Sequence, residues 1–290
     1  MENKTEHIRK KKANMPIDDI INEMADKDES TDANSALVPG QMTTENIRFL
    51  TLNFFLRPPL IWSNEGDYKD ARVDYFITHY LSKYDVICFQ EVFCIMNSRK
   101  QYLIRAAKAA GFHYYAENES PTQILGVESL CGGLLILSRY PIADTEFLPF
   151  KVPGVLADSS CVKGCLYAKI DIGTPINDGK PSQQYLHLFT SHMQASYFYC
   201  SLELYVESYV CRFKQIREAR DFIKSKIGNA ENFSRARDLT IFAGDFNQNG
   251  APKNNNQIMY LCQIEQEKRY EPVLELFRDE YASLLKGLSF

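Results

Sequence analysis

The sequence predicts a layered α/β domain that follows a polar N-terminal tail. Strands and amphipathic helices alternate in the first half of the folded region, and the middle of the chain is richer in strands. One long helix then precedes a final apolar, β-prone run that ends in a glycine and two polar residues. Alternation of this kind is typical of helices packed on the faces of a sheet. No internal repeat and no second folded domain are expected.

Hydrophobic spacing gives the expected elements in order. Residues 47–53 alternate as a strand does, and residues 68–83 have helical spacing. Residues 85–89 read as a short buried strand, and an amphipathic helix is expected over about 97–110. Further strands are expected at 133–137, 166–172, 185–191 and 239–243.

The clearest helix covers residues 210–227. Its predicted core stripe consists of Val210, Phe213, Ile216, Phe222, Ile223 and Ile227. The polar loop at 174–184 joins two strands, which predicts antiparallel pairing between them. A helix-like segment is expected up to residue 285.

Composition narrows the classes of protein. The net charge of -4 and the pI near 5.8 disfavour a dedicated nucleic-acid binder. Eight scattered cysteines without zinc spacing fit a reducing compartment. No apolar signal segment and no run long enough for a membrane span are found, so a cytoplasmic protein is expected. Residues 1–45 are expected to be a disordered polar tail, and residues 46–290 a single partial domain.

Four apolar strands each lead into a polar residue suited to binding. These residues are Asn53, Glu91, His192 and the pair Asp245 and Asn247. In an extended chain, residues two apart project to the same side, so Asp245 and Asn247 leave their strand together. Each residue alone is more often a turn, a cap or a structural histidine. Together they indicate one cleft equipped for metal-assisted phosphoryl or phosphodiester hydrolysis.

The motifs around these residues resemble those of the endonuclease/exonuclease/phosphatase superfamily. Within it the chain is most similar to neutral sphingomyelinases of the sphingomyelinase C type, from about residue 47 onwards. The motifs are residues 51–53, 90–93, 132–142, 163–164, 191–195 and 244–247, with Arg212 and Gln215 on the long helix.

This resemblance implies a four-layered α/β sandwich and hydrolysis of sphingomyelin to ceramide and phosphocholine that depends on Mg²⁺, with Mn²⁺ as an alternative to Mg²⁺. Glu91 would be the principal metal ligand, with Asn53 beside it. Asp245 and Asn247 would orient water and bind phosphate or a second metal, and His192 would stabilise charge on the phosphate oxygens. The roles come from the motif match alone.

The resemblance also implies a gating pair and contact with a membrane surface. Asp158 and Lys163 match the positions of an Asp/Lys pair that gates the site in neutral sphingomyelinases. An ordinary loop ion pair is the alternative. Because the implied substrate is a phospholipid, the aromatic stretches 54–62 and 197–199 are candidates for peripheral membrane contact, with burial in the core as the alternative. The oligomeric state is left open.

One departure from the family pattern bears on activity. The family ends with a Ser-Asp-His motif whose histidine is the general base, but none of the five histidines here follows Asp245. The last strands of the sandwich are therefore expected to be missing. Three alternatives stay open: another superfamily phosphoesterase such as an inositol polyphosphate 5-phosphatase or a nuclease, a catalytically inactive binding protein, and a fragment that does not fold alone.

Overall fold

A computed structural model describes residues 46–58, 68–93, 98–118, 130–173, 184–196, 202–228, 233–234 and 236–248. The predicted tail (residues 1–45), the predicted C-terminal helix and most of the loop at 174–184 lie outside these ranges. The prediction that the last strands are missing is not tested by the described residues. Among the described helices, none is both long enough and apolar enough to cross a bilayer.

Two four-stranded sheets form the centre of the molecule. The first has the order β1-β2-β5-β3, made by β1 (Phe49–Leu56), β2 (Val86–Val92), β5 (Leu135–Ser138) and β3 (Tyr114–Glu117). The second has the order β10-β9-β8-β6, made by β10 (Leu239–Asp245), β9 (Tyr185–His192), β8 (Gly164–Asp171) and β6 (Ile142–Pro149). A separate parallel pair joins β4 (Leu130–Cys131) to β7 (Cys161–Val162).

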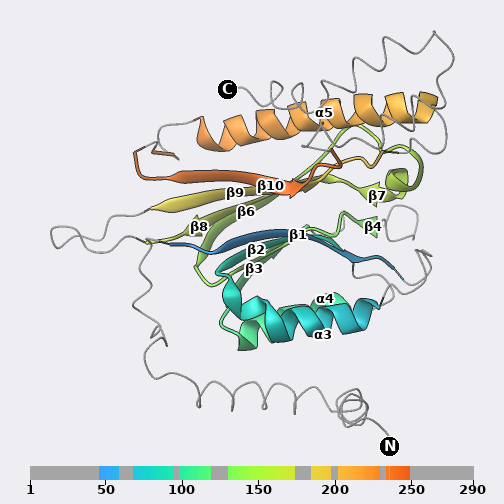
Figure 1. Ribbon diagram of the computed structural model, residues 1–290. Helices are drawn as coiled ribbons and strands as arrows, with labels where there is room; N and C mark the ends of the chain where they lie inside the picture. The colour runs from blue at the N-terminus through green and yellow to red at the C-terminus, as the bar shows by residue number, and fades with distance from the viewer. Residues whose placement is uncertain are drawn as a thin grey trace, which may run out of the picture.

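Helices cover the outer face of each sheet, which gives four layers (Figure 1). The helices α3 (Lys69–His79) and α4 (Arg99–Ala109) lie against the first sheet, and α5 (Leu202–Ile227) lies against the second. Two 3-10 turns complete the described elements, η1 (Leu81–Lys83) and η2 (Leu156–Ser160). The predicted four-layered α/β sandwich is therefore confirmed.

Side chains that alternate between the two faces of each strand fill the three spaces between these layers. In β2, Ile87 and Phe89 pack towards α3 and α4, whereas Val86 and Cys88 pack between the two sheets. In β8, Leu166, Ala168 and Ile170 enter the same central cluster, and Cys165 and Tyr167 face α5. β2 is covered on both faces, so all seven of its residues are buried, and its apolar run Val86–Phe89 ends in the polar residues Gln90 and Glu91.

Most predicted elements are present, with differences at their ends. The antiparallel pairing of β8 with β9 is confirmed. The strands β3 and β6 were not predicted; their solvent-facing residues hide the apolar alternation. The long helix begins at Leu202, earlier than predicted, and its predicted core stripe is partly wrong. Val210 is 42% exposed, while Arg212 and Gln215 are buried because they bond the loop after β9.

Candidate functional site at the strand ends

The polar residues predicted at four strand ends lie together at one edge of the two sheets. The sheets meet here through their edge strands β1 and β10, which contact each other. β1 runs parallel to β2, and β10 runs parallel to β9, so all four strands deliver their C-terminal residues to this edge. Asp245 lies directly opposite His192 in the register of β10 and β9. The sequence motifs therefore converge although they are far apart in the chain.

Asn53 joins the carboxylates contributed by the two sheets. Its side-chain nitrogen donates to Glu91 Oε1 at 2.8 Å and to Asp245 Oδ2 at 2.8 Å. Its side-chain oxygen accepts the N–H of Phe55 at 3.0 Å, which fixes the amide. Asn53 was predicted to end its strand, but β1 continues to Leu56. The prediction is nearly right, since regular pairing with β2 breaks immediately after Asn53.

Glu91 has an unusual backbone conformation that depends on the glycine pair. Its φ is 58°, in the left-handed region that non-glycine residues seldom adopt outside functional sites. Gly133 packs against this turn: a Cβ there would lie 3.0 Å from Glu91 Cα, and Gly133 itself has a φ of 67°. The carbonyl of Gly133 accepts the N–H of Val92 at 2.9 Å. The glycine thus supports the turn that aims Glu91 into the site.

Burial shifts the protonation of the two central groups. It raises the pKa of the Glu91 carboxyl, an effect that the bond from Asn53 and the positive charges of Arg57 and Lys163 oppose. It also lowers the pKa of His192 well below its ordinary value, and the charge of Lys163 adds to this. His192 Nε2 lies 3.9 Å from Glu91 Oε1, too far for a hydrogen bond. His192 is therefore a neutral imidazole at pH 7.

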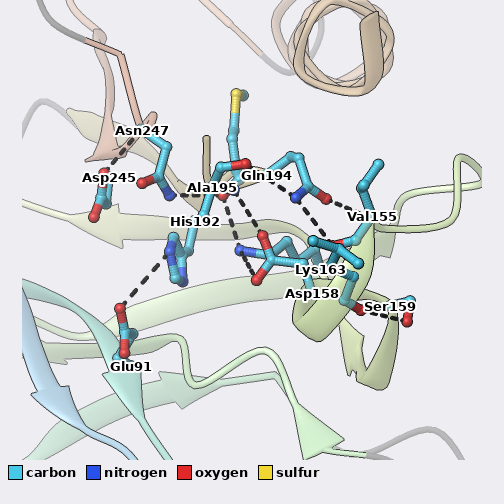
Figure 2. A network of polar contacts seen from close by, with 12 residues as sticks. Glu91, Val155, Asp158, Ser159, Lys163, His192, Gln194, Ala195, Asp245 and Asn247 are labelled. Carbon is cyan, nitrogen blue, oxygen red and sulfur yellow. Dashed lines mark hydrogen bonds and ion pairs between the residues drawn. The ribbon is translucent and has the colours of Figure 1, made fainter. Parts of the chain in front are cut away.

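Asp245 and Asn247 form a tight turn at the end of β10. The N–H of Asn247 donates to Asp245 Oδ1 at 2.8 Å, and Asn247 has a φ of 52°. The side-chain nitrogen of Asn247 donates to the carbonyl of Met193 at 2.8 Å. Figure 2 shows Asp245 and Asn247 beside His192, with Glu91 across the gap between the sheets. Asp245 therefore lies at the other strand ends as predicted, but β10 ends at this residue and Asn247 belongs to the turn that follows, so the prediction that both leave one extended strand on the same side is wrong.

Asp158 and Lys163 form a pair on the far side of the same segment (Figure 2). Lys163 Nζ lies 3.3 Å from Asp158 Oδ1 and donates to the carbonyl of Met193 at 2.8 Å. The other carboxylate oxygen of Asp158 accepts the N–H of Ala195 at 2.7 Å. Because Asn247 donates to the same carbonyl of Met193, the pair is connected directly to the site through this one peptide group.

The side chain of Gln194 holds the loop that carries Asp158. Its Oε1 accepts the N–H of Val155 at 2.7 Å, and its Nε2 donates to the carbonyl of Val155 at 3.3 Å. The backbone of Gln194 is held from α5, where its N–H donates to Gln215 Oε1 and its carbonyl accepts from Arg212 Nη1. Gln194 belongs to the motif 191–195, and Arg212 and Gln215 to the motif on the long helix, but the sequence predicted no role for any of the three.

The predicted membrane-contact stretches are only partly described. Phe54 is 3% exposed and packs against Phe76 and Phe89, so its place is the core and the proposed contact is wrong for this residue. Residues 59–67 and 197–199 lie outside the described residues, and contact through them stays a prediction.

The donor set suits a hard cation. The carboxylates of Glu91 and Asp245 meet at the side-chain amide of Asn53. Mg²⁺ is usually bound by one or two carboxylates together with waters and substrate phosphate oxygens. Within the described ranges, no group of three or more His, Cys, Asp or Glu side chains converges as a metal centre. The carboxylate oxygens of Glu91 and Asp245 fit Mg²⁺ better than a metal that prefers nitrogen or sulfur ligands.

Comparisons with known proteins show the family of this chain. Residues 71–256 match the model of the Endonuclease/Exonuclease/phosphatase family. A sphingomyelinase from Dictyostelium discoideum is 30% identical over 227 residues, which cover 72% of this chain and 47% of that protein. Sphingomyelinase C from Leptospira interrogans is 27% identical over 247 residues, covering 81% of this chain and 40% of that protein. The chain thus spans less than half the length of these two curated relatives.

Solved structures share the fold. A magnesium-bound variant of beta toxin from Staphylococcus aureus superposes with a TM-score of 0.56 at 22% identity. The match covers 83% of this chain and 70% of that one. At this level of identity the likeness concerns the arrangement of sheets and helices.

Proposed function

Because this chain belongs to the endonuclease/exonuclease/phosphatase family, we propose that it is a Mg²⁺-dependent phosphodiesterase that hydrolyses sphingomyelin to ceramide and phosphocholine. One observation carries the proposal: the Asn53 amide joins the carboxylates of Glu91 and Asp245 from opposite sheets. Phosphoryl transfer needs a site of this kind, where a cation and the reacting phosphate are held together. The similarity to two proteins named sphingomyelinases supports the choice of substrate.

Glu91 would hold the cation, with Asn53 and Asp245 beside it. Burial raises the pKa of Glu91, so the free carboxyl is costly to ionise, and a bound cation would stabilise its charged form. When bound there, Mg²⁺ would neutralise negative charge that develops on the phosphoryl oxygens. Mn²⁺ accepts the same oxygen ligands and is expected to substitute.

Asp245 and Asn247 would position the attacking water and the phosphate. Asp245 already accepts two hydrogen bonds, from Asn53 and from the N–H of Asn247, so its carboxylate is fixed before substrate arrives. Such preorganisation lowers the reorganisation needed in the transition state.

His192 would act as a neutral hydrogen-bond donor to a phosphate oxygen. Its low pKa excludes a fixed positive charge at pH 7, so its contribution is a directed N–H. Its place opposite Asp245 in the sheet register keeps the imidazole close to the reacting group.

Asp158 and Lys163 would control access to this site. Both contact the segment 193–195, which also accepts a hydrogen bond from the side chain of Asn247. A change in the Asp158–Lys163 pair would therefore shift the peptide on which Asn247 rests. Peripheral contact with a phospholipid surface accompanies this proposal, since the substrate resides in a bilayer.

The alternative is a protein that binds a phosphodiester at this cleft without turning it over. The hydrogen-bonded unit of Asn53, Glu91 and Asp245 would hold a cation and a phosphate whether or not hydrolysis follows.

A substrate panel separates these functions. The chain is assayed with Mg²⁺ for phosphocholine release from sphingomyelin vesicles, phosphate release from an inositol polyphosphate, and cleavage of DNA. Phosphocholine release alone supports the proposal. Phosphate release from the inositol compound, or DNA cleavage, would show that sphingomyelin is not the substrate. Binding of phosphocholine without any hydrolysis supports the binding protein.

A further inference from the structure

Arg57 lies at the exit of β1 beside the central carboxylate. Its Nε is 3.9 Å from Glu91 Oε2, beyond hydrogen-bond distance. This nitrogen is buried and has no hydrogen-bond partner among the described residues. The side chain as a whole is 28% exposed, so the guanidinium is partly accessible to solvent although its Nε is buried.

The guanidinium is held in place by an aromatic platform. Its central carbon lies 4.0 Å from the centroid of the Phe55 ring, a cation–π contact. Phe55 is itself fixed at both backbone groups: its N–H donates to Asn53 Oδ1 at 3.0 Å, and its carbonyl accepts from Arg72 Nη2 at 2.9 Å. Phe55 also adopts a φ of 56°. One rigid segment thus carries both Asn53 and Arg57, with Phe55 midway between them.

This arrangement leaves donors available beside the carboxylates. A guanidinium has five N–H donors in a planar fork that matches phosphate oxygens. The contact with Glu91 uses charge and no hydrogen bond, so the fork is not saturated by it. An unpaired N–H in a buried position favours an acceptor that arrives with a ligand.

We propose that Arg57 is a substrate-binding residue that donates to a non-bridging oxygen of the phosphodiester held next to Glu91. The proposal deepens the proposed function, on which it rests for the presence of a phosphate at this cleft. It adds the residue that recognises the anionic head group, which no motif in the sequence points to.

A role limited to neutralising Glu91 makes a different prediction. In that case removal of the Arg57 charge would strengthen Mg²⁺ binding, because a neighbouring cation repels the metal. Phosphate affinity would be unaffected. If Arg57 binds phosphate, its removal weakens phosphate affinity whatever happens to the metal.

The test is isothermal titration of phosphocholine, inositol phosphate and inorganic phosphate into the chain, with and without Mg²⁺. Mg²⁺ alone is titrated in parallel. The variants are Arg57→Gln and Arg57→Lys, with Arg220→Gln as control, since Arg220 pairs with Asp221 on the outer helix α5. Circular dichroism and thermal unfolding confirm that each variant is folded.

Arg57→Gln is expected to weaken phosphate binding about 10- to 100-fold, the loss of one charge-assisted hydrogen bond. Arg57→Lys is expected to recover part of this, because it keeps the charge and loses the fork. Equal phosphate affinity in Arg57→Gln and the unaltered chain overturns the proposal, as does the absence of phosphate binding in the unaltered chain. Should Arg57→Gln not fold, Arg57→Lys with unaltered affinity overturns it equally.

The same titrations separate this inference from the proposed function. If inositol phosphate binds more tightly than phosphocholine and depends on Arg57, the assignment of Arg57 stands and the sphingomyelin substrate falls. If phosphocholine binds and is independent of Arg57, the substrate stands and the assignment falls.

Discussion

The side-chain amide of Asn53 lies 2.8 Å from the carboxylate of Asp245, although 192 positions separate them in the chain. Asn53 belongs to the edge strand of one sheet and Asp245 to the edge strand of the other. Their contact therefore ties the two sheets together at the edge where the polar strand ends meet. It also makes the proposed metal ligands and the proposed water-positioning residue parts of one hydrogen-bonded unit.

Glu91→Ala is expected to lower the affinity for Mg²⁺ by more than about 100-fold. Loss of a residue that only supports a metal ligand already costs about 10–100-fold, and loss of the principal ligand itself should cost more. The measurement is a Mg²⁺ titration by calorimetry. Glu207→Ala is the control, since Glu207 is an exposed carboxylate on α5. Equal Mg²⁺ affinity in Glu91→Ala would exclude Glu91 as the principal ligand.

Gly244→Ala is expected to destabilise the fold by about 3 kcal/mol or more. Its φ is 152°, and a Cβ would lie 2.0 Å from the carbonyl oxygen of Ser191 in the neighbouring strand, so strain and a steric clash add. Gly173→Ala is the matched control, because it has a φ of 46° and open space around a Cβ, and it should cost about 1 kcal/mol. Urea unfolding gives both values, and equal losses would show that the close approach of β10 to β9 is not a constraint.

Gln194→Leu is expected to loosen the loop that carries Asp158. The substitution removes both bonds to Val155 and leaves the buried contacts of α5 with the backbone in place. Hydrogen exchange of residues 154–158 should accelerate at least about 10-fold, the equivalent of one to two lost hydrogen bonds. Gln101→Leu, on the exposed face of α4, should leave this exchange unchanged. Unaltered protection in Gln194→Leu would show that another contact holds the loop.

Stability is expected to fall as pH falls below about 6.5, in part because of His187. Burial lowers the pKa of His187 from 6.5, and its Nδ1 lies 2.9 Å from the hydroxyl of Tyr167. A histidine with a lowered pKa in the folded state binds more protons when unfolded, so acid favours unfolding between the two pKa values. Its maximum contribution is about 1.4 kcal/mol per pH unit.

His187→Gln should flatten this dependence between pH 6.5 and 5, as measured by urea unfolding at several pH values. His192, whose pKa is also lowered, keeps a residual slope in both proteins. Parallel stability curves for His187→Gln and the unaltered chain would contradict the assignment.

Local patterns in the sequence predict a layered α/β domain and the polar residues at its strand ends, whereas the four layers and the roles of those residues were implied by the resemblance alone. Apolar runs ending in Asn53, Glu91, His192 and Asp245 are visible without a structure, and parallel neighbours then place their ends at one edge. Features that depend on contacts between distant parts of the chain could not be predicted from the sequence. Burial of Arg212 follows from a carbonyl that it binds after β9, and its charge predicts the opposite.

Backbone conformation accounts for the other differences. The left-handed turn at Glu91 is stabilised by Gly133, more than 40 positions away, so no local pattern marks it. Arg57 directly follows β1 and carries no motif, and its proximity to Glu91 depends on how Phe55 is held. The edge strand β6 escaped prediction because five of its eight residues are exposed, and the run Asp144–Glu146 at its middle is polar.

The most direct test of the account is phosphocholine release from sphingomyelin vesicles by this chain and by Asp245→Ala, each with Mg²⁺ and with EDTA. If the strand ends form one phosphodiesterase site, release requires Mg²⁺ and falls at least about 100-fold in Asp245→Ala, the loss typical of a single preorganised group. Release that persists in EDTA, or that Asp245→Ala leaves unchanged, would contradict the account.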